Sequence, residues 1–190
     1  IVHRDLHSKN ILVHQDSIKL TDFGLSKRVE EVTSNHLNFF GVIPYIDPKR
    51  FNIQTYTLNT KSDVYSVGIL LWEISSGCPP FYTEGEKYDV SLAVKISGGL
   101  RETTIPDTPE DYVKLYNECW DSEPDNRPAM YQVVDKLNAI TSKNDMKEND
   151  QMDHHESNLQ ISKIPPHSNN NGFLDQKCQA FPFNHLDLLT

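Results

Sequence analysis

Two short motifs near the start of the chain, separated by a stretch that favours β-structure, constrain the fold more than any other feature. The motifs are His3-Arg4-Asp5-Leu6-His7-Ser8-Lys9-Asn10 and Asp22-Phe23-Gly24. Between them, the apolar runs 11–13 and 18–20 flank the turn-favouring residues 15–17. This spacing predicts a two-stranded hairpin. Such a hairpin would bring the two motifs together.

The two motifs resemble the catalytic loop and the metal-binding loop of a eukaryotic protein kinase. The resemblance covers residues 1–140, and the Pro44-Tyr45 dipeptide is similar to members of the tyrosine-kinase-like group. It implies an α+β, mainly α-helical fold, namely the C-terminal lobe of a kinase with a small β-hairpin beside the catalytic loop. The sequence holds no glycine-rich phosphate loop and no Val-Ala-Ile-Lys strand, so an N-terminal lobe is expected in the parent protein.

The resemblance implies a chemical role for three side chains of the motifs. Asp5 would orient the substrate hydroxyl and take its proton, while Asn10 and Asp22 would hold the Mg²⁺ ions that accompany ATP. Hard oxygen ligands are what Mg²⁺ requires. The alternative for Asp5 and Asn10 is an ordinary turn with a helix cap.

Further residues of the two loops are expected to assist. Lys9 would place a cation beside the transferred phosphate, and His7 would do so only when protonated. A merely solvated Lys9 is the competing interpretation. The residues expected to support the loops are His3, Phe23, Gly24 and Asp63.

The polar stretch 25–40 lies where a kinase carries its activation loop, and its lack of periodicity predicts a mobile segment. Arg4 precedes the proposed catalytic aspartate, as in kinases whose activation loop is ordered by an arginine–phosphate pair. The candidate phosphate acceptors are Thr33 and Ser34. Unmodified loop residues are the equal alternative.

The segment 41–49 lines up with the end of a kinase activation loop, with two substitutions. Val42 replaces a threonine whose hydroxyl contacts the catalytic aspartate in serine/threonine kinases. Lys49 replaces a glutamate that pairs with an arginine, which here should be Arg127. Because two cations repel one another, either Asp47 accepts Arg127 or this anchor is lost. We favour Asp47.

Hydrophobic periodicity predicts a mainly helical body. A capping box at 60–63 opens a buried helix that Gly77 ends. A second helix is expected to follow a Thr108 cap and reach Cys119, and a third to run from Pro128 through Leu137. A shorter helix is predicted over 90–96.

Composition restricts the class of protein. The chain has 190 residues and a net charge of −9, from 18 Lys and Arg against 27 Asp and Glu. This balance argues against nucleic acid as a partner. No apolar run is long enough for a membrane span, and no secretory signal opens the chain, so a cytoplasmic location is expected.

The pattern changes near residue 140, which predicts a kinase lobe over 1–140 and a polar, disordered tail over 141–190. The apolar residues of 181–189 could dock on a partner or on the body, and a solvated tail is favoured.

The sequence therefore predicts a protein kinase that uses ATP and Mg²⁺ to phosphorylate serine or threonine, with tyrosine open, in protein substrates. A truncated kinase or pseudokinase lobe that docks other proteins without catalysis is the alternative, favoured mildly by Val42 and Lys49. A small-molecule phosphotransferase is disfavoured by the activation segment.

Overall fold

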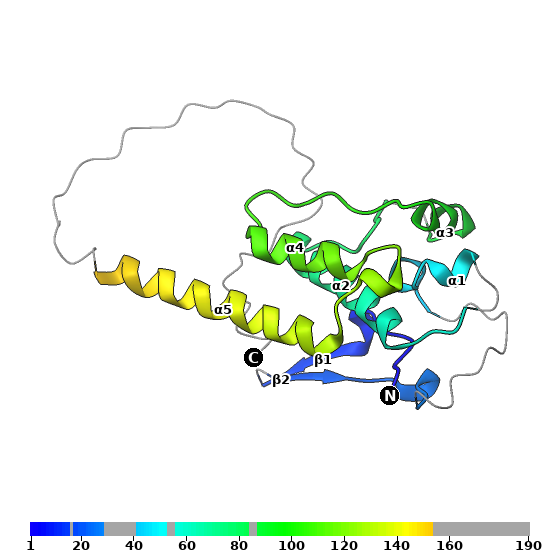
Figure 1. Cartoon of the computed structure of the whole chain (residues 1–190), viewed down its shortest axis with the longest axis horizontal. Helices are drawn as coiled ribbons and strands as arrows, with labels where there is room; N and C mark the ends of the chain where they lie inside the picture. The colour runs from blue at the N-terminus through cyan, green and yellow to red at the C-terminus, as the bar shows by residue number, and fades with distance from the viewer. Residues whose placement is uncertain (16, 29–40, 53–55, 84–86, 154–190) are drawn as a thin grey trace, which may run out of the picture.

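The computed structural model describes residues 1–15, 17–28, 41–52, 56–83 and 87–153. This part of the chain is mainly helical, with a single two-stranded antiparallel sheet. Figure 1 shows the hairpin along one edge of a helical body, with both strands beneath the helices. The predicted α+β, mainly α-helical fold is confirmed.

Strands β1 (Ile11–His14) and β2 (Ser17–Leu20) form the predicted hairpin, with Ile11 opposite Leu20. The backbone N–H of Thr21 donates to the carbonyl of Asn10 at 2.9 Å and continues the pairing by one step. The end of the first motif and the start of the second are therefore neighbours across the open end of the hairpin. Asp22 is the next residue after this pair.

Helix α2 (Thr60–Ser76) forms the centre of the core, and most of its residues are buried. Its N-cap is Asn59, whose side chain accepts from the backbone N–H of Lys61 at 2.8 Å, while the Ser62 hydroxyl accepts from the Asn59 N–H at 3.1 Å. The predicted box over 60–63 is thus shifted by one residue. Because Asn59 and Ser62 serve as the cap, the carboxylate of Asp63 remains available to another partner.

The remaining helices surround α2 (Figure 1). They are α1 (Lys49–Asn52), α3 (Val90–Ser97), α4 (Glu110–Cys119) and α5 (Met130–Asp153). The described chain also forms the 3-10 turns η1 (Ser8–Asn10), η2 (Phe23–Leu25), η4 (Ile43–Tyr45) and η5 (Pro124–Asn126). The buried core cluster includes Tyr65 and Ile69 of α2, Tyr116 of α4 and Val133 of α5.

Two helix boundaries differ from the prediction. The N-cap of α4 is Pro109 without a side-chain cap bond, and the Thr108 hydroxyl is buried with no hydrogen-bond partner among the described residues. Helix α5 continues to Asp153. The expected boundary at residue 140 therefore falls inside this helix, the division into lobe and tail stays a prediction, and residues 154–190 lie outside the described part.

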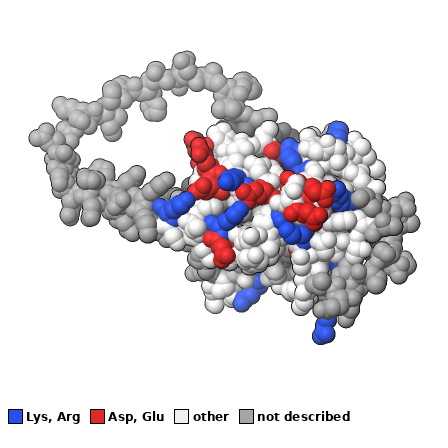
Figure 2. All heavy atoms as spheres, in the orientation of Figure 1, with Lys and Arg blue, Asp and Glu red and all other residues white. Residues whose placement is uncertain are grey.

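Opposite charges lie side by side over the surface of α4 and α5 (Figure 2). Lys136 of α5 pairs with Glu118 of α4, and Lys143 pairs with Asp111 at 2.7 Å. Exposed pairs of this kind contribute little to stability, so burial of apolar surface holds α5 on α4. Within the described residues, no helix combines the length and apolar character needed to cross a bilayer.

Helices α2 and α4 approach closely at Gly68. A Cβ atom built at this position would lie 2.8 Å from Cys119 Cβ and 3.0 Å from the Trp120 backbone nitrogen. No room exists there for a methyl group.

We expect Gly68→Ala to lower the free energy of unfolding by about 1 to 3 kcal/mol, the usual range for overpacking, although alanine is the better helix former. Urea denaturation would measure this. Gly98→Ala is the matched control, because the nearest atom to its added Cβ lies at 3.4 Å. Equal stability of both variants would contradict the close approach.

Candidate active site

The backbone of the first motif is held by the core helix. The carboxylate of Asp63 accepts the N–H of His3 at 2.7 Å and the N–H of Arg4 at 2.9 Å. Arg4 has a φ of 72°, a left-handed conformation that is uncommon for a non-glycine residue. Burial raises the pKa of Asp63, and the two N–H groups oppose this rise. The two bonds fix the turn that presents Asp5.

Side chains and backbone then join the first motif to the second. Val2 and Lys27 exchange two backbone hydrogen bonds, of 2.8 and 3.0 Å. The imidazole Nε2 of His3 lies 3.2 Å from the Thr21 carbonyl oxygen, and its ring packs at 4.9 Å from the ring of Phe23. The His3 side chain of the first loop thus contacts both Thr21 and Phe23 of the second, and the supporting roles of His3 and Phe23 stay predictions.

Asp5 and Asn10 contact each other directly. The carboxamide Nδ2 of Asn10 donates to the Asp5 carbonyl at 2.9 Å and lies 3.4 Å from the Asp5 carboxylate oxygen Oδ2. These bonds use only the nitrogen of the carboxamide, so its Oδ1 can accept from another group. Asn10 is buried, which limits the directions in which its side chain can point.

Asp22 follows the hairpin with an exposed side chain and a φ of 57°. Its Oδ1 accepts the N–H of Gly24 at 3.2 Å, which leaves Oδ2 for a cation. One carboxylate and one amide oxygen suit Mg²⁺, which takes few protein ligands and completes its shell with phosphate and water. Among the described residues, no three His, Cys, Asp or Glu side chains form a metal-binding group.

The second carboxylate oxygen of Asp5 is differently placed. Oδ1 is buried and has no hydrogen-bond partner within the described chain. His7 Nε2 lies 3.5 Å from this oxygen. Gly41 also approaches it, since a Cβ built there would lie 3.1 Å from Oδ1. Gly41 has a φ of +113°, which disfavours any larger residue.

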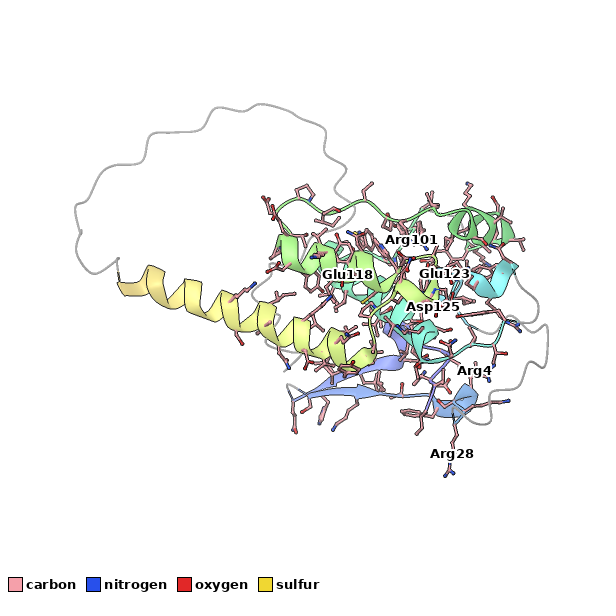
Figure 3. The ribbon with its side chains drawn as sticks, in the orientation of Figure 1. Arg4, Arg28, Arg101, Glu118, Glu123 and Asp125 are labelled. Carbon is pink, nitrogen blue, oxygen red and sulfur yellow. The ribbon has the colours of Figure 1, made fainter. Side chains whose placement is uncertain are left out.

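Lys9 and Arg4, the two cationic residues expected to act on phosphate groups, lie in different surroundings. Lys9 is exposed. Arg4 is half-buried and donates to the Leu25 carbonyl at 3.4 Å, and its Nε has no partner among the described residues. Figure 3 shows Arg4 near the η2 turn and Arg28 pointing outward. The candidate phosphate acceptors, Thr33 and Ser34, lie outside the described residues.

Asp47 accepts Arg127 in a fully buried, two-bond ion pair. The guanidinium nitrogens lie 2.7 and 3.0 Å from the two carboxylate oxygens, and both side chains are 0% exposed. Burial alone would raise the pKa of Asp47, but the bonds and charge of Arg127 outweigh burial and hold this pKa below its ordinary value. The favoured alternative from the sequence is therefore confirmed, and Lys49 pairs instead with Glu123 at 2.6 Å.

Other contacts at this site carry no clear sequence signal. The Tyr56 hydroxyl donates to Asp47 Oδ2 at 2.8 Å from an irregular segment. The guanidinium groups of Arg101 and Arg127 lie over the ring of Tyr65, at 5.3 and 5.2 Å from its centroid. The Tyr45 hydroxyl donates to Glu73 at 2.5 Å. Each depends on three-dimensional packing that residue spacing does not encode.

Comparisons with known proteins agree with this geometry. Residues 1–137 match the family model described as protein tyrosine and serine/threonine kinase. The chain is 37% identical over 147 residues to a "probable serine/threonine-protein kinase" of Dictyostelium discoideum, covering 72% of this chain and 6% of the relative.

Two further relatives extend the comparison. A LIM domain-containing serine/threonine-protein kinase of the same organism is 34% identical, covering 78% of this chain and 22% of the relative. A mitogen-activated protein kinase kinase kinase of Drosophila melanogaster is 31% identical, covering 74% and 12%. The chain thus spans less than a quarter of the length of each of these three relatives.

Asp47→Asn should lower the free energy of unfolding by about 3 kcal/mol, because removal of one partner leaves a buried charge uncompensated. Denaturant titration would measure the change. Glu123→Gln is the control, since it breaks the exposed pair with Lys49 and should cost less than about 1 kcal/mol. A smaller loss for Asp47→Asn than for the control would show that the buried pair does not anchor the segment.

Acid should reduce the difference in free energy of unfolding between the wild type and Asp47→Asn. A carboxyl whose pKa is lowered in the folded state stabilises the fold above its unfolded pKa, and this contribution is lost as pH falls through the folded value. The difference in unfolding free energy should therefore stay constant from neutral pH down to about pH 5 and shrink below the ordinary Asp value of 3.8. A difference that grows on acidification would contradict the direction of the shift.

Proposed function

This chain belongs to the protein tyrosine and serine/threonine kinase family, and on that premise we propose that it forms the catalytic lobe of an enzyme that phosphorylates protein substrates. The proposal names serine and threonine hydroxyls as acceptors, since the two Dictyostelium relatives described above carry the name serine/threonine-protein kinase. The observation that carries it is the Asn10 carboxamide bound to both the carbonyl and the carboxylate of Asp5.

Asp5 acts on the substrate hydroxyl in this proposal. Its carboxylate orients the hydroxyl and takes the proton as the oxygen forms a bond to the γ-phosphorus and the bond to the departing ADP oxygen breaks. The Asp63 bonds to His3 and Arg4 keep the turn in place during this step. Such positioning accounts for most of the catalysis in phosphoryl transfer.

Asn10 Oδ1 and Asp22 Oδ2 are the proposed ligands of Mg²⁺. Kinases of this family generally use ATP and Mg²⁺, which supply the phosphoryl group and neutralise its charge. The hairpin supports the assignment because the Thr21–Asn10 bond makes the two ligand-bearing segments neighbours. Lys9, exposed beside them, is proposed to contribute positive charge near the transferred phosphate.

A second lobe is proposed to cover the hairpin and complete the ATP site. Leu12, Val13 and Leu20 of the hairpin are 53, 58 and 47% exposed. Leu12 and Val13 are consecutive in a strand, so they face opposite sides of the ribbon. Apolar side chains exposed on both sides favour a covering partner. Residues 1–140 are proposed as the lobe that receives it, and 141–190 as a separate tail.

Arg4 is proposed to bind a phosphate on Thr33 or Ser34. Among the described residues, Arg4 Nε has no partner and Nη1 makes one long bond to Leu25, so most donors of the guanidinium stay available within this part of the chain. A phosphate oxygen is a strong acceptor for such donors. Phosphorylation would then order the loop next to the first motif.

We expect Asp5→Asn to reduce phosphotransfer by about 100-fold to 10,000-fold, because the amide cannot take the proton. Transfer of ³²P from ATP to a serine- and threonine-containing peptide library, catalysed by the complete protein, would measure this.

Asp125→Asn is the matched control, because this aspartate is exposed in η5 and away from the hairpin. If Asp5→Asn transferred phosphate as fast as Asp125→Asn, Asp5 would not be the catalytic residue. No transfer by the wild type, with its lobe and activating phosphate present, would remove the proposed function.

A further inference from the structure

We propose that His7 is a positioning residue for Asp5, whose Nε2–H group donates to the carboxylate oxygen Oδ1. This inference rests on the proposed function, since it assigns a role within the same site. It differs from a role of His7 as a cation for phosphate, because the hydrogen bond does not need a charged ring.

The two carboxylate oxygens of Asp5 have different neighbours. Oδ2 lies 3.4 Å from the Asn10 carboxamide nitrogen, whereas Oδ1 lies 3.5 Å from His7 Nε2. The side chains of His7 and Asp5 are 11 and 14% exposed, respectively. Water therefore has little access to Oδ1, and a protein donor is needed to satisfy it.

The distance of 3.5 Å is longer than a formed hydrogen bond. In the absence of substrate, hydrogen bonds of active sites are often long and tighten when the reacting groups are in place. A shift of about half an ångström would bring Nε2 to the usual N–H···O distance of about 2.9 to 3.0 Å. Among the described lysine, arginine and histidine side chains, only His7 places a nitrogen within 4 Å of Oδ1.

The backbone segment of Gly41 and Val42 offers no side-chain donor to Oδ1. Gly41 faces this oxygen, as its constructed Cβ position shows, and it has no side chain. Val42 follows it and is apolar, packed against the core cluster. Neither Gly41 nor Val42 therefore brings a side-chain donor to this oxygen.

The imidazole of His7 is itself held by the core. Its ring centroid lies 6.0 Å from that of Tyr45, with the planes tilted by 57°. The Tyr45 hydroxyl donates to Glu73 of α2 at 2.5 Å and lies 3.3 Å from the Ser8 hydroxyl. Burial and the bond to Glu73 raise the pKa of Tyr45, so this hydroxyl stays a donor. Contacts thus run from α2 through Tyr45 and His7 to Asp5.

Three roles of His7 predict different results for three variants. If His7 is a hydrogen-bond donor, His7→Gln keeps a donor and should retain turnover within about threefold, while His7→Leu should lose about 10-fold to 100-fold, as expected for a misplaced reacting group. If His7 is a phosphate cation, His7→Lys should be active and His7→Gln as impaired as His7→Leu. If it only packs on Tyr45, His7→Leu should match the wild type.

The readout is the turnover number of the complete protein at saturating ATP, with the KM for ATP measured alongside. The proposal expects His7→Leu to lower turnover while leaving this KM within about twofold, since the lost bond orients Asp5 and not the nucleotide. Wild-type turnover in His7→Leu, or rescue by lysine but not glutamine, would overturn it.

A second measurement does not depend on activity. Long-range ¹H–¹⁵N spectra of the ¹⁵N-labelled chain at alkaline pH report which ring nitrogen of each histidine carries the proton, and His7 is identified by the signals missing from His7→Gln. The proposal expects the proton on Nε2, and expects Asp5→Ala to shift that signal. A proton on Nδ1 alone would overturn the proposal even if phosphotransfer were confirmed, and a proton on Nε2 would support it even if the proposed enzymatic function failed.

Discussion

The carboxylate of Asp63 joins the motif that carries Asp5 to the central helix of the core. It accepts two consecutive backbone N–H groups, one of them from Arg4 in a left-handed conformation. An isolated loop would rarely keep that conformation. Because Asp63 belongs to a buried helix that begins with its own cap at Asn59, the rigidity of α2 reaches the proposed catalytic aspartate through two short bonds.

The buried pair of Asp47 and Arg127 anchors the next segment in a comparable way. Lys49 stands where a kinase normally has a glutamate, and from the sequence this substitution mildly favoured a docking module without catalysis. The structure weakens that support, since Asp47 binds the same arginine through both oxygens. The acidic partner of Arg127 thus lies two residues before the position at which the kinase pattern has a glutamate. Val42 remains as a departure from the kinase pattern, while His7 Nε2 lies 3.5 Å from the Asp5 carboxylate.

Sequence patterns predicted the parts of the fold that depend on local spacing. The hairpin followed from two short β-prone runs around a turn. For the Asp47–Arg127 pair, the kinase resemblance supplied Arg127, and the repulsion between two cations favoured Asp47 over Lys49 as its partner. The N-cap of α2 was predicted one residue too late, at Thr60, because a capping pattern can be read in two registers. The preference for Asn over Thr as an N-cap favours Asn59, which is the observed cap. The polar end of α5 carries no apolar stripe, so periodicity could not detect it.

The site was predictable in its motif residues and not in their neighbours. Asp5, Asn10 and Asp22 could be selected because each has a fixed place in a motif. The proximity of His7 to Oδ1, by contrast, depends on how Tyr45 packs beneath the ring and on the backbone of Gly41. These segments are far apart in the sequence, and only tertiary packing brings them together.

The close approach of α2 and α4 also determines the chemistry of Cys119. This thiol is free, fully buried and directly beneath Gly68, and burial raises its pKa to about 12. The thiolate is the form that reacts with alkylating reagents. Cys119 is therefore inert as long as the two helices stay together, and its alkylation reports directly on their separation.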